Sequence, residues 1–394
     1  MNWKGVFFLG WKYLVRNRTK TMLLVSAFSL VWLLPAAIGV VVSQVEIHLR
    51  ERAESTPLLL GKTGSALELV FNGLYFTKPQ IGTLPSGEVQ TIGDDGLVTA
   101  IPIHAKYSSG EYRIVGTSLD YFSFRELRVG EGRQLIRLGE CVVGSAVAEG
   151  TGVEIGDAII SSPEALFDLA GVYPLKMNVV GILEPSGSPD DEAIFVDVKT
   201  CWVIGGLGHG HQEAEKTEEK ERLNLEEEEG GVIRLNASVV EYNEITPENA
   251  DSFHFHGDTG DFPLTAAVIL PRDAKAQAIV KGRYVSSELL QLISPKEEMN
   301  ELFETVFSVQ KLVLWLLFAI GVATLAIGAL VFLLSYRLRS DEFRQLRVLG
   351  ADPIVLRALV GFESIFVVVS SLIVAGALVA LIGFVSPGII REVL

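Results

Sequence analysis

The sequence is poor in cysteine, with only Cys141 and Cys201 in 394 residues. The two thiols form no Cys-x-x-Cys pair, and they can make at most one disulfide. The chain is therefore neither a cysteine-stapled scaffold nor a protein with a recognisable dithiol redox motif.

Basic residues are also in deficit, and the formal net charge of −15 argues against nucleic acid as a partner. Motifs for nucleotide binding and hydrolysis are lacking as well. Residues 61–63, GKT, match the end of a P-loop, but Thr56 stands where the motif requires glycine. The sequence contains no Gly-x-Ser-x-Gly nucleophile motif. We therefore predict no catalytic residue and no nucleotide site in this chain.

Long apolar runs, by contrast, are prominent, and 49% of all residues are hydrophobic. The runs at 21–43, 312–336 and 358–385 reach the length of about 20 apolar residues that a helix needs to cross a bilayer. We predict transmembrane helices at 21–46, 308–336 and 358–385. Pro35 lies inside the first run, where a membrane environment tolerates a proline kink. Residues 1–20 are predicted to form an amphipathic helix at the cytoplasmic interface.

Basic residues set the predicted orientation, because Lys and Arg are enriched in cytoplasmic segments. Residues 1–46 carry five Lys and Arg against one acid, whereas residues 47–307 carry 21 basic and 42 acidic residues. Five arginines lie between the second and third apolar runs. We therefore expect the N-terminus and the loop 337–357 in the cytoplasm. Residues 47–307 and the short tail 386–394 are expected on the outer side.

Residues 47–307 are enough for a large outer domain, which we expect to be of the α+β class. Gly, Pro, Ser and Asp separate strand-like runs at 67–76, 112–119, 141–148, 177–183, 192–198, 231–242 and 264–271. Residues 273–284 and the stretch from about Lys296 into the second apolar run are predicted to be helical. The segment at about 205–231 is dense in Glu and Lys, which indicates a mobile loop or a solvated helix.

Four of the six histidines fall in two His-x-His pairs of this outer region. In an extended segment, both imidazoles of such a pair point to one face, which is a start for a zinc or copper site. The alternative is a polar loop and a strand face with exposed histidines. The candidate metal ligands are His209, His211, His254 and His256.

The loop 337–357 separates two membrane helices and carries its own helical pattern. Phe343, Leu346 and Leu349 stand at helical spacing, which suits a short amphipathic helix that enters a groove of a partner. Leu349, Gly350 and Ala351 are expected to end this helix. Asp352 and Pro353 are expected to begin the next one as its cap and its first residue. Glu363 lies just inside the third span. Such an acid is a functional candidate by default, and the alternative is a local pair with Arg357 or a residue of the N-terminal arm.

Three stretches of this sequence carry a family resemblance. They are RNRTKTMLLVSAFSL at 16–30, CVVGSAVAEGTGVEIGDAI at 141–159 with KMNVVGILEPSGSPDDEAIFVDV at 176–198, and RSDEFRQLRVLGADPIVLRALVGFES at 339–364. Together they resemble the permease subunits of the MacB/FtsX/LolC-LolE class of ABC transporters, the type VII or mechanotransmission class. The third stretch is the most specific of them.

This resemblance implies an α-helical protein of the bacterial inner membrane with a periplasmic α+β domain between the first two spans. It implies a non-catalytic permease subunit that pairs with a second one, identical or different, and docks a cytoplasmic ATPase that binds ATP and magnesium. The resemblance further implies that the complex exports or extracts a substrate on the periplasmic side. A periplasmic adaptor or substrate-binding protein would be a further partner. The loop residues expected to couple to the ATPase are Arg337, Arg339, Glu342, Phe343, Leu346, Arg347, Leu349, Gly350 and Ala351.

The sequence departs from this family in one respect. The family usually has four spans with both ends in the cytoplasm, whereas three spans are predicted here. A three-span variant and a clipped sequence both fit. The alternative functions are a membrane-anchored periplasmic protein that binds or senses metal, and an FtsX-like regulator of periplasmic enzymes.

Overall fold

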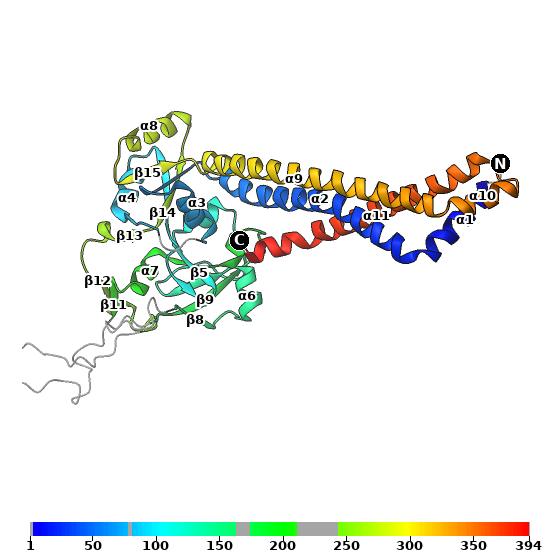
Figure 1. Cartoon of the computed structure of the whole chain (residues 1–394). Helices are drawn as coiled ribbons and strands as arrows, with labels where there is room; N and C mark the ends of the chain where they lie inside the picture. Colours follow the sequence, from blue (N-terminus) through cyan, green and yellow to red (C-terminus); the bar gives the residue numbers. More distant parts are fainter. Residues whose placement is uncertain (1–2, 78–80, 163–173, 211–242, 394) are drawn as a thin grey trace, which may run out of the picture. The chain divides into compact units, whose positions relative to one another are not determined.

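The computed structural model describes residues 3–77, 81–162, 174–210 and 243–393. These residues fall into two compact units (Figure 1). The helical unit comprises Met1–Leu49 and Glu301–Val393, and the α/β unit comprises Arg50–Asn300. The predicted strand at 231–242, His211 and most of the acidic segment lie outside the described residues.

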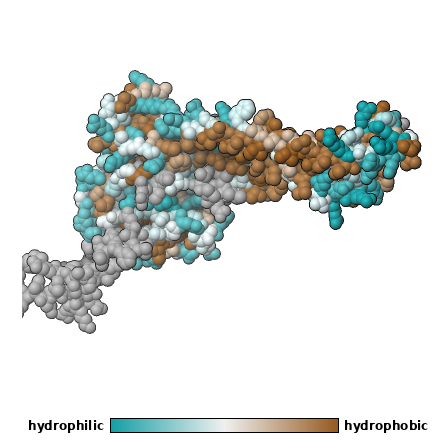
Figure 2. All heavy atoms as spheres, in the orientation of Figure 1, coloured by the Kyte–Doolittle hydropathy of each residue, from teal (hydrophilic) through white to brown (hydrophobic). Residues whose placement is uncertain are grey.

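The helical unit is built from long helices that match the apolar runs. Among the described residues, α2, α9 and α11 are long and apolar enough to cross a membrane. Figure 2 shows a hydrophobic band over these helices and hydrophilic residues at the end that carries α1 and α10. The helices are α1 (Trp3–Arg16), α2 (Arg18–Glu54), α9 (Pro295–Leu338), α10 (Ser340–Val348) and α11 (Pro353–Val393).

Packing between these helices uses both apolar and small residues. Leu24 and Phe28 of α2 are buried together with Val367 of α11. The Ser29 hydroxyl donates a hydrogen bond of 3.2 Å to the carbonyl oxygen of Ser371, which also joins α2 to α11. Such contacts suit membrane helices, whose association depends on close packing and on hydrogen bonds.

The α/β unit is centred on a mixed sheet of eleven strands, counted over the part of the chain that the structure describes. Its main path runs in the order β15, β1, β14, β3, β5, β10, β7, β9, β6, with β4 beside β5 and β8 beside β9. The pairs β5–β10 and β7–β9 are parallel, and the other pairs are antiparallel. The strands are β1 (Leu58–Lys62), β3 (Val98–His104), β4 (Ser108–Ser109), β5 (Tyr112–Thr117), β6 (Val129–Gly132), β7 (Glu140–Val143), β8 (Ala158–Ile160), β9 (Lys176–Leu183), β10 (Ala193–Asp197), β14 (Ala266–Pro271) and β15 (Leu290–Ile293).

Two small ribbons and several helices complete this unit. The ribbons pair β2 (Leu84–Pro85) with β13 (Pro263–Leu264), and β11 (Gly208–Gly210) with β12 (Phe253–Phe255). The core forms two clusters, one around Cys141, Ile194 and Cys201 and one around Leu58, Trp202 and Ile269. The helices are α3 (Ala66–Tyr75), α4 (Ser86–Asp94), α5 (Leu119–Phe124), α6 (Ser145–Thr151), α7 (Val198–Ile204) and α8 (Ala274–Tyr284), with short 3-10 turns η1 (Pro189–Glu192), η3 (Ala250–Ser252) and η4 (Thr259–Asp261).

The structure confirms the predicted strands near 112–119, 177–183, 192–198 and 264–271 and the helix at 273–284. The strand predicted at 67–76 is wrong, because these residues form α3. The Ser65 side chain accepts a hydrogen bond from the Glu68 N–H and caps this helix. The strand predicted at 141–148 ends at Val143, and α6 follows it until Gly152 adopts a left-handed conformation.

Candidate functional site

The loop between α9 and α11 folds as a short helix, α10, held by a turn at each end. Gly350 has a φ of 93°, a conformation that favours glycine, and the Ala351 N–H bonds back to the Leu346 carbonyl at 2.9 Å. The Asp352 carboxylate then accepts a bond of 2.8 Å from the Ile354 N–H and caps α11, which begins at Pro353. These turns confirm the predicted helix stop and start.

Phe343 holds one face of α10 against α11. Its side chain is 4% exposed and packs with Leu356 and Leu359, while Leu346 contacts the same cluster. The Tyr336 ring of α9 lies 5.4 Å from the Phe343 ring. The structure thus uses Phe343 to fix α10 within the hairpin, where sequence reasoning placed it in a partner's groove.

Arg339 joins three helices at this end of the helical unit. Its guanidinium donates a hydrogen bond of 2.7 Å to the Glu363 carboxylate, and this ion pair is mostly buried. The guanidinium carbon also lies 3.6 Å from the centre of the Tyr13 ring of α1. A local pair was one of the two alternatives for Glu363, and the structure has such a pair with Arg339 in place of Arg357 or a residue of the N-terminal arm. Arg339 therefore links the start of α10 to both α1 and α11.

The surface of α10 outside the Phe343 contact is exposed and combines arginines with apolar side chains. Val348 and Leu349 are each 83% exposed. Arg344, also exposed, lies one turn before Val348, and the exposed Arg347 directly precedes Val348. We call Arg344, Arg347, Val348 and Leu349 the α10 face. Of the predicted coupling residues, Arg337, Glu342, Arg347, Leu349 and Gly350 are exposed, Arg339, Leu346 and Ala351 are half-buried, and Phe343 is buried.

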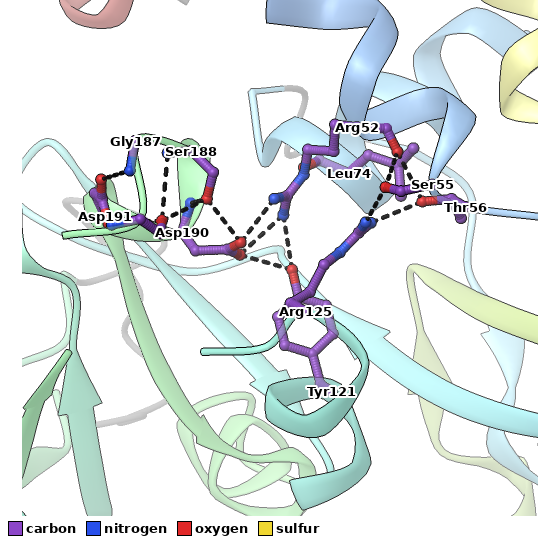
Figure 3. A network of polar contacts seen from close by, with 11 residues as sticks. Arg52, Ser55, Thr56, Leu74, Tyr121, Arg125, Gly187, Ser188, Asp190 and Asp191 are labelled. Carbon is purple, nitrogen blue, oxygen red and sulfur yellow. Dashed lines mark hydrogen bonds and ion pairs between the residues drawn. The ribbon is translucent and has the colours of Figure 1, made fainter. Parts of the chain in front are cut away.

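Sequence reasoning missed a buried polar network in the α/β unit (Figure 3). Arg52, in the last turn of α2, donates two hydrogen bonds of 2.7 and 2.8 Å to the Asp190 carboxylate in η1. It also donates to the Tyr121 hydroxyl at 2.7 Å and to the Leu74 carbonyl oxygen. The Tyr121 hydroxyl in turn donates to Asp190 at 2.7 Å. Because the partners are far apart in sequence, no local pattern points to them.

Charge pairing stabilises this network although it lies away from water. Burial opposes ionisation of Asp190, but the charge and hydrogen bonds of Arg52 lower the pKa of Asp190 below its ordinary value. Burial likewise opposes the charge on Arg52, and Asp190 raises the pKa of Arg52 instead. Arg125 adds bonds of 2.9 and 2.8 Å to the hydroxyls of Ser55 and Thr56, where α2 ends. The end of α2 is therefore fixed within the α/β unit.

Three of the four predicted histidine ligands come together on the β11–β12 ribbon. His209 lies directly opposite His254 in the antiparallel register, and His256 follows two residues later on the same face. The Nε2 atoms of His209 and His256 are 3.3 Å apart. One ligand nitrogen from each of the three rings lies within 4.8 Å of the others. His211, the fourth predicted ligand, lies outside the described residues.

The other face of this ribbon is apolar. Phe253 and Phe255 alternate with the histidines and pack on the core, with Phe255 6.3 Å from the Trp202 ring. Gly208 stands opposite Phe255, and Gly210 stands opposite Phe253. A Cβ atom at either glycine would lie 2.6–2.7 Å from the facing ring. The Gly-His-Gly and Phe-His-Phe triplets therefore hold the histidines outward on a fixed ribbon.

The two cysteines are free thiols in the core of the α/β unit. Burial raises the pKa of each thiol, which disfavours the reactive thiolate.

No protein-family model matches this chain, and no curated protein matches it. Among solved structures, the chain is similar to the periplasmic region of MacB from Actinobacillus actinomycetemcomitans. That match has 10% identity and a TM-score of 0.34, and it covers 66% of this chain and 97% of that one. The extracellular domain of the noncanonic ABC-type transporter YknZ from Gram-positive bacteria is similar at 11% identity and a TM-score of 0.32. This second match covers 60% of this chain and 98% of the YknZ domain.

Proposed function

We propose that this chain is the non-catalytic, membrane-spanning subunit of an ABC-type complex of the bacterial inner membrane. A separate cytoplasmic ATPase, which binds ATP and magnesium, docks on the α10 face. Its movement is passed through the helices to the α/β unit, which does mechanical work on a substrate at the outer side of the membrane. The family resemblance of residues 339–364 led to this proposal, and the contacts of α10 support it.

The observation that carries the proposal is the division of the α10 surface into a buried part and an exposed part. Phe343 fixes one face to α11, while Val348 and Leu349 remain exposed beside Arg344 and Arg347. Exposed apolar side chains flanked by arginines are typical of a surface that a partner covers. The arginines favour a groove with acidic residues at its rim.

Two further contacts support transmission of force. The Arg339–Glu363 pair and the Tyr13 ring would pass a displacement of α10 to α1 and α11. The helix that follows α1 is α2, and its C-terminal turn carries Arg52, which pairs with Asp190 of η1. A movement along α2 would therefore reach η1 of the α/β unit. Interactions of this kind have discrete arrangements and can couple distant sites.

A second permease subunit, identical or different, belongs to this proposal. Leu312, Trp315 and Phe318 of α9 are exposed in the single chain and are available to lipid and to such a subunit. A periplasmic adaptor or substrate-binding protein would complete the assembly on the outer side.

The test is Val348→Asp combined with Leu349→Asp in the full chain, purified from its native membrane. The quantity measured is the MgATP hydrolysis activity that co-purifies with the chain. Loss of two interface anchors costs about 2 kcal/mol or more, so we expect the associated activity to fall about tenfold or more. Leu289→Asp is the control, because Leu289 is an exposed leucine of the α/β unit at 74% exposure.

If no ATP hydrolysis activity co-purifies with the wild-type chain, the proposal is contradicted. A double variant that keeps the full activity would also contradict it. Phe343→Asp is less suitable as a test, because the buried Phe343 side chain supports α10 itself.

A further inference from the structure

We propose that His209, His254 and His256 form a binding site for a late divalent transition-metal ion, Zn²⁺ or Cu²⁺. The site goes beyond the proposed function and does not depend on an ATPase partner. Its basis is the arrangement of three imidazoles on one face of the β11–β12 ribbon.

The distances suit a metal ion of this class. Two imidazole nitrogens bound tetrahedrally to one zinc ion at about 2.0–2.1 Å lie about 3.3–3.4 Å apart. The Nε2 atoms of His209 and His256 are 3.3 Å apart. The three ligand nitrogens lie within 4.8 Å of one another, so rotation of the exposed rings would bring all three to one ion. Imidazole suits zinc and copper, whereas calcium and magnesium prefer oxygen ligands.

A hydrogen bond already selects the ligand atom of His254. Its Nδ1 lies 3.1 Å from the carbonyl oxygen of Ser252. A carbonyl oxygen can only accept, so Nδ1 carries the proton and Nε2 presents its lone pair. Metal-bound histidines commonly have such a second partner, which fixes the ring and the tautomer.

The ribbon brings the three histidines together before a metal arrives. Phe253 and Phe255 pack on the core from the opposite face, and Gly208 and Gly210 admit their rings. The histidines therefore need no large rearrangement to bind. His254 and His256 are exposed and His209 is half-buried, so a bound metal ion would be accessible from the solvent. The acidic excess of residues 47–307 also favours an approaching cation.

The chemistry leaves a coordination position open. Three neutral imidazoles leave the bound ion with its full positive charge and room for a fourth ligand, such as water. Because a protonated imidazole has no lone pair for a metal, binding is expected to weaken at acidic pH.

Titration calorimetry on the full chain, purified without a polyhistidine tag and treated with a chelator, tests this site. Zn²⁺ and Cu²⁺ are titrated separately, with Mg²⁺ as the negative control. We expect about one ion to bind with micromolar or tighter affinity. The triple variant His209→Asn, His254→Asn, His256→Asn should weaken binding about 100-fold, since even outer-shell partners contribute 10–100-fold. His48→Asn changes a histidine of α2 and should bind as the wild type does.

Protection of the buried thiols Cys141 and Cys201 from a thiol reagent shows whether the triple variant keeps its fold. If it does not, His256→Asn alone serves, because His256 follows the end of β12. Binding of Co²⁺ with the absorption of a tetrahedral complex would support the same ligands. Binding no tighter than millimolar, or wild-type affinity in a folded histidine variant, overturns the proposal.

Discussion

His104 shows how burial can make the stability of the fold sensitive to pH through a single residue. Its side chain is 1% exposed at the end of β3, and its ring lies 5.4 Å from that of Tyr107. Within the described residues, neither ring nitrogen has a hydrogen-bond partner. Burial, with Lys106 nearby, lowers the pKa of His104 to about 4. The neutral imidazole therefore behaves as a core residue, and protonation is costly only in the folded state.

The pKa of His104 predicts a loss of stability in mild acid. Its native pKa lies below the unfolded value of about 6.5, so the unfolded chain takes up a proton first as the pH falls. The free energy of unfolding should decrease between about pH 6.5 and 4, by about 2 kcal/mol at pH 5. His104→Leu removes this group and should reduce the drop in melting temperature between neutral pH and pH 5. His48→Asn should keep it, and an equal drop in the leucine variant would refute the assignment.

The buried Arg52–Asp190 pair predicts that a substitution of Asp190 strongly destabilises the α/β unit. Asp190→Asn leaves the Arg52 charge buried without its counter-charge, which costs about 3–5 kcal/mol. Thiol labelling of Cys141 and Cys201 measures this, because both are buried in the α/β unit and the chain has no other cysteine. We expect faster labelling in Asp190→Asn. The double variant with Arg52→Met should recover part of the protection, since it removes the unpaired charge. Unchanged labelling in Asp190→Asn would mean that the pair does not stabilise this unit.

At the scale of elements, glycine sets how closely α9 approaches α2. A Cβ atom at Gly328 of α9 would collide with the Phe28 ring, whereas Gly39 of α2 has open space around it. Gly328→Leu should therefore separate the two helices and cost about 1–3 kcal/mol. Gly39→Leu is the matched control and should leave the melting temperature of the full chain in detergent nearly unchanged. Equal shifts for the two variants would argue against close packing at Gly328.

The elements also show what the sequence could predict and what it could not. Residue patterns located the long apolar helices, because a run of about 20 apolar residues has few other uses. They failed at α3, where the apolar run was interpreted as a strand. Ser65 and Glu68 are spaced as in a capping box and could have indicated a helix start. The sequence could not predict the Arg52–Asp190 pair, since only the folded sheet brings these residues together.

The candidate site shows the same division. Periodicity predicted a short helix around Phe343, Leu346 and Leu349 and the turn that ends it, but not which face of the helix is buried. That choice depends on Leu356 and Leu359 of the following helix, which cover Phe343. The two His-x-His pairs were visible in the sequence, while their meeting required the register that sets His209 against His254. Local spacing therefore predicts elements, and long-range contacts decide the site.

At the scale of the whole molecule, charge is divided between the ends and the middle of the chain. Residues 47–307 hold 42 acidic and 21 basic residues, while five arginines lie between the apolar runs 312–336 and 358–385. Since cytoplasmic segments are enriched in basic residues, the α10 face should lie in the cytoplasm and the α/β unit on the outer side. The proposed ATPase and the proposed metal site would then be on opposite sides of the membrane.

Labelling of introduced cysteines with a membrane-impermeant maleimide tests this arrangement. Leu349→Cys and Leu289→Cys place thiols at exposed leucines, one on the α10 face and one in the α/β unit. Whole spheroplasts should label Leu289→Cys, and only opened membranes should label Leu349→Cys. The native thiols are buried and give a low background. Labelling of Leu349→Cys in sealed spheroplasts would place α10 outside, where it could not reach a cytoplasmic ATPase, although the histidine site could still bind metal.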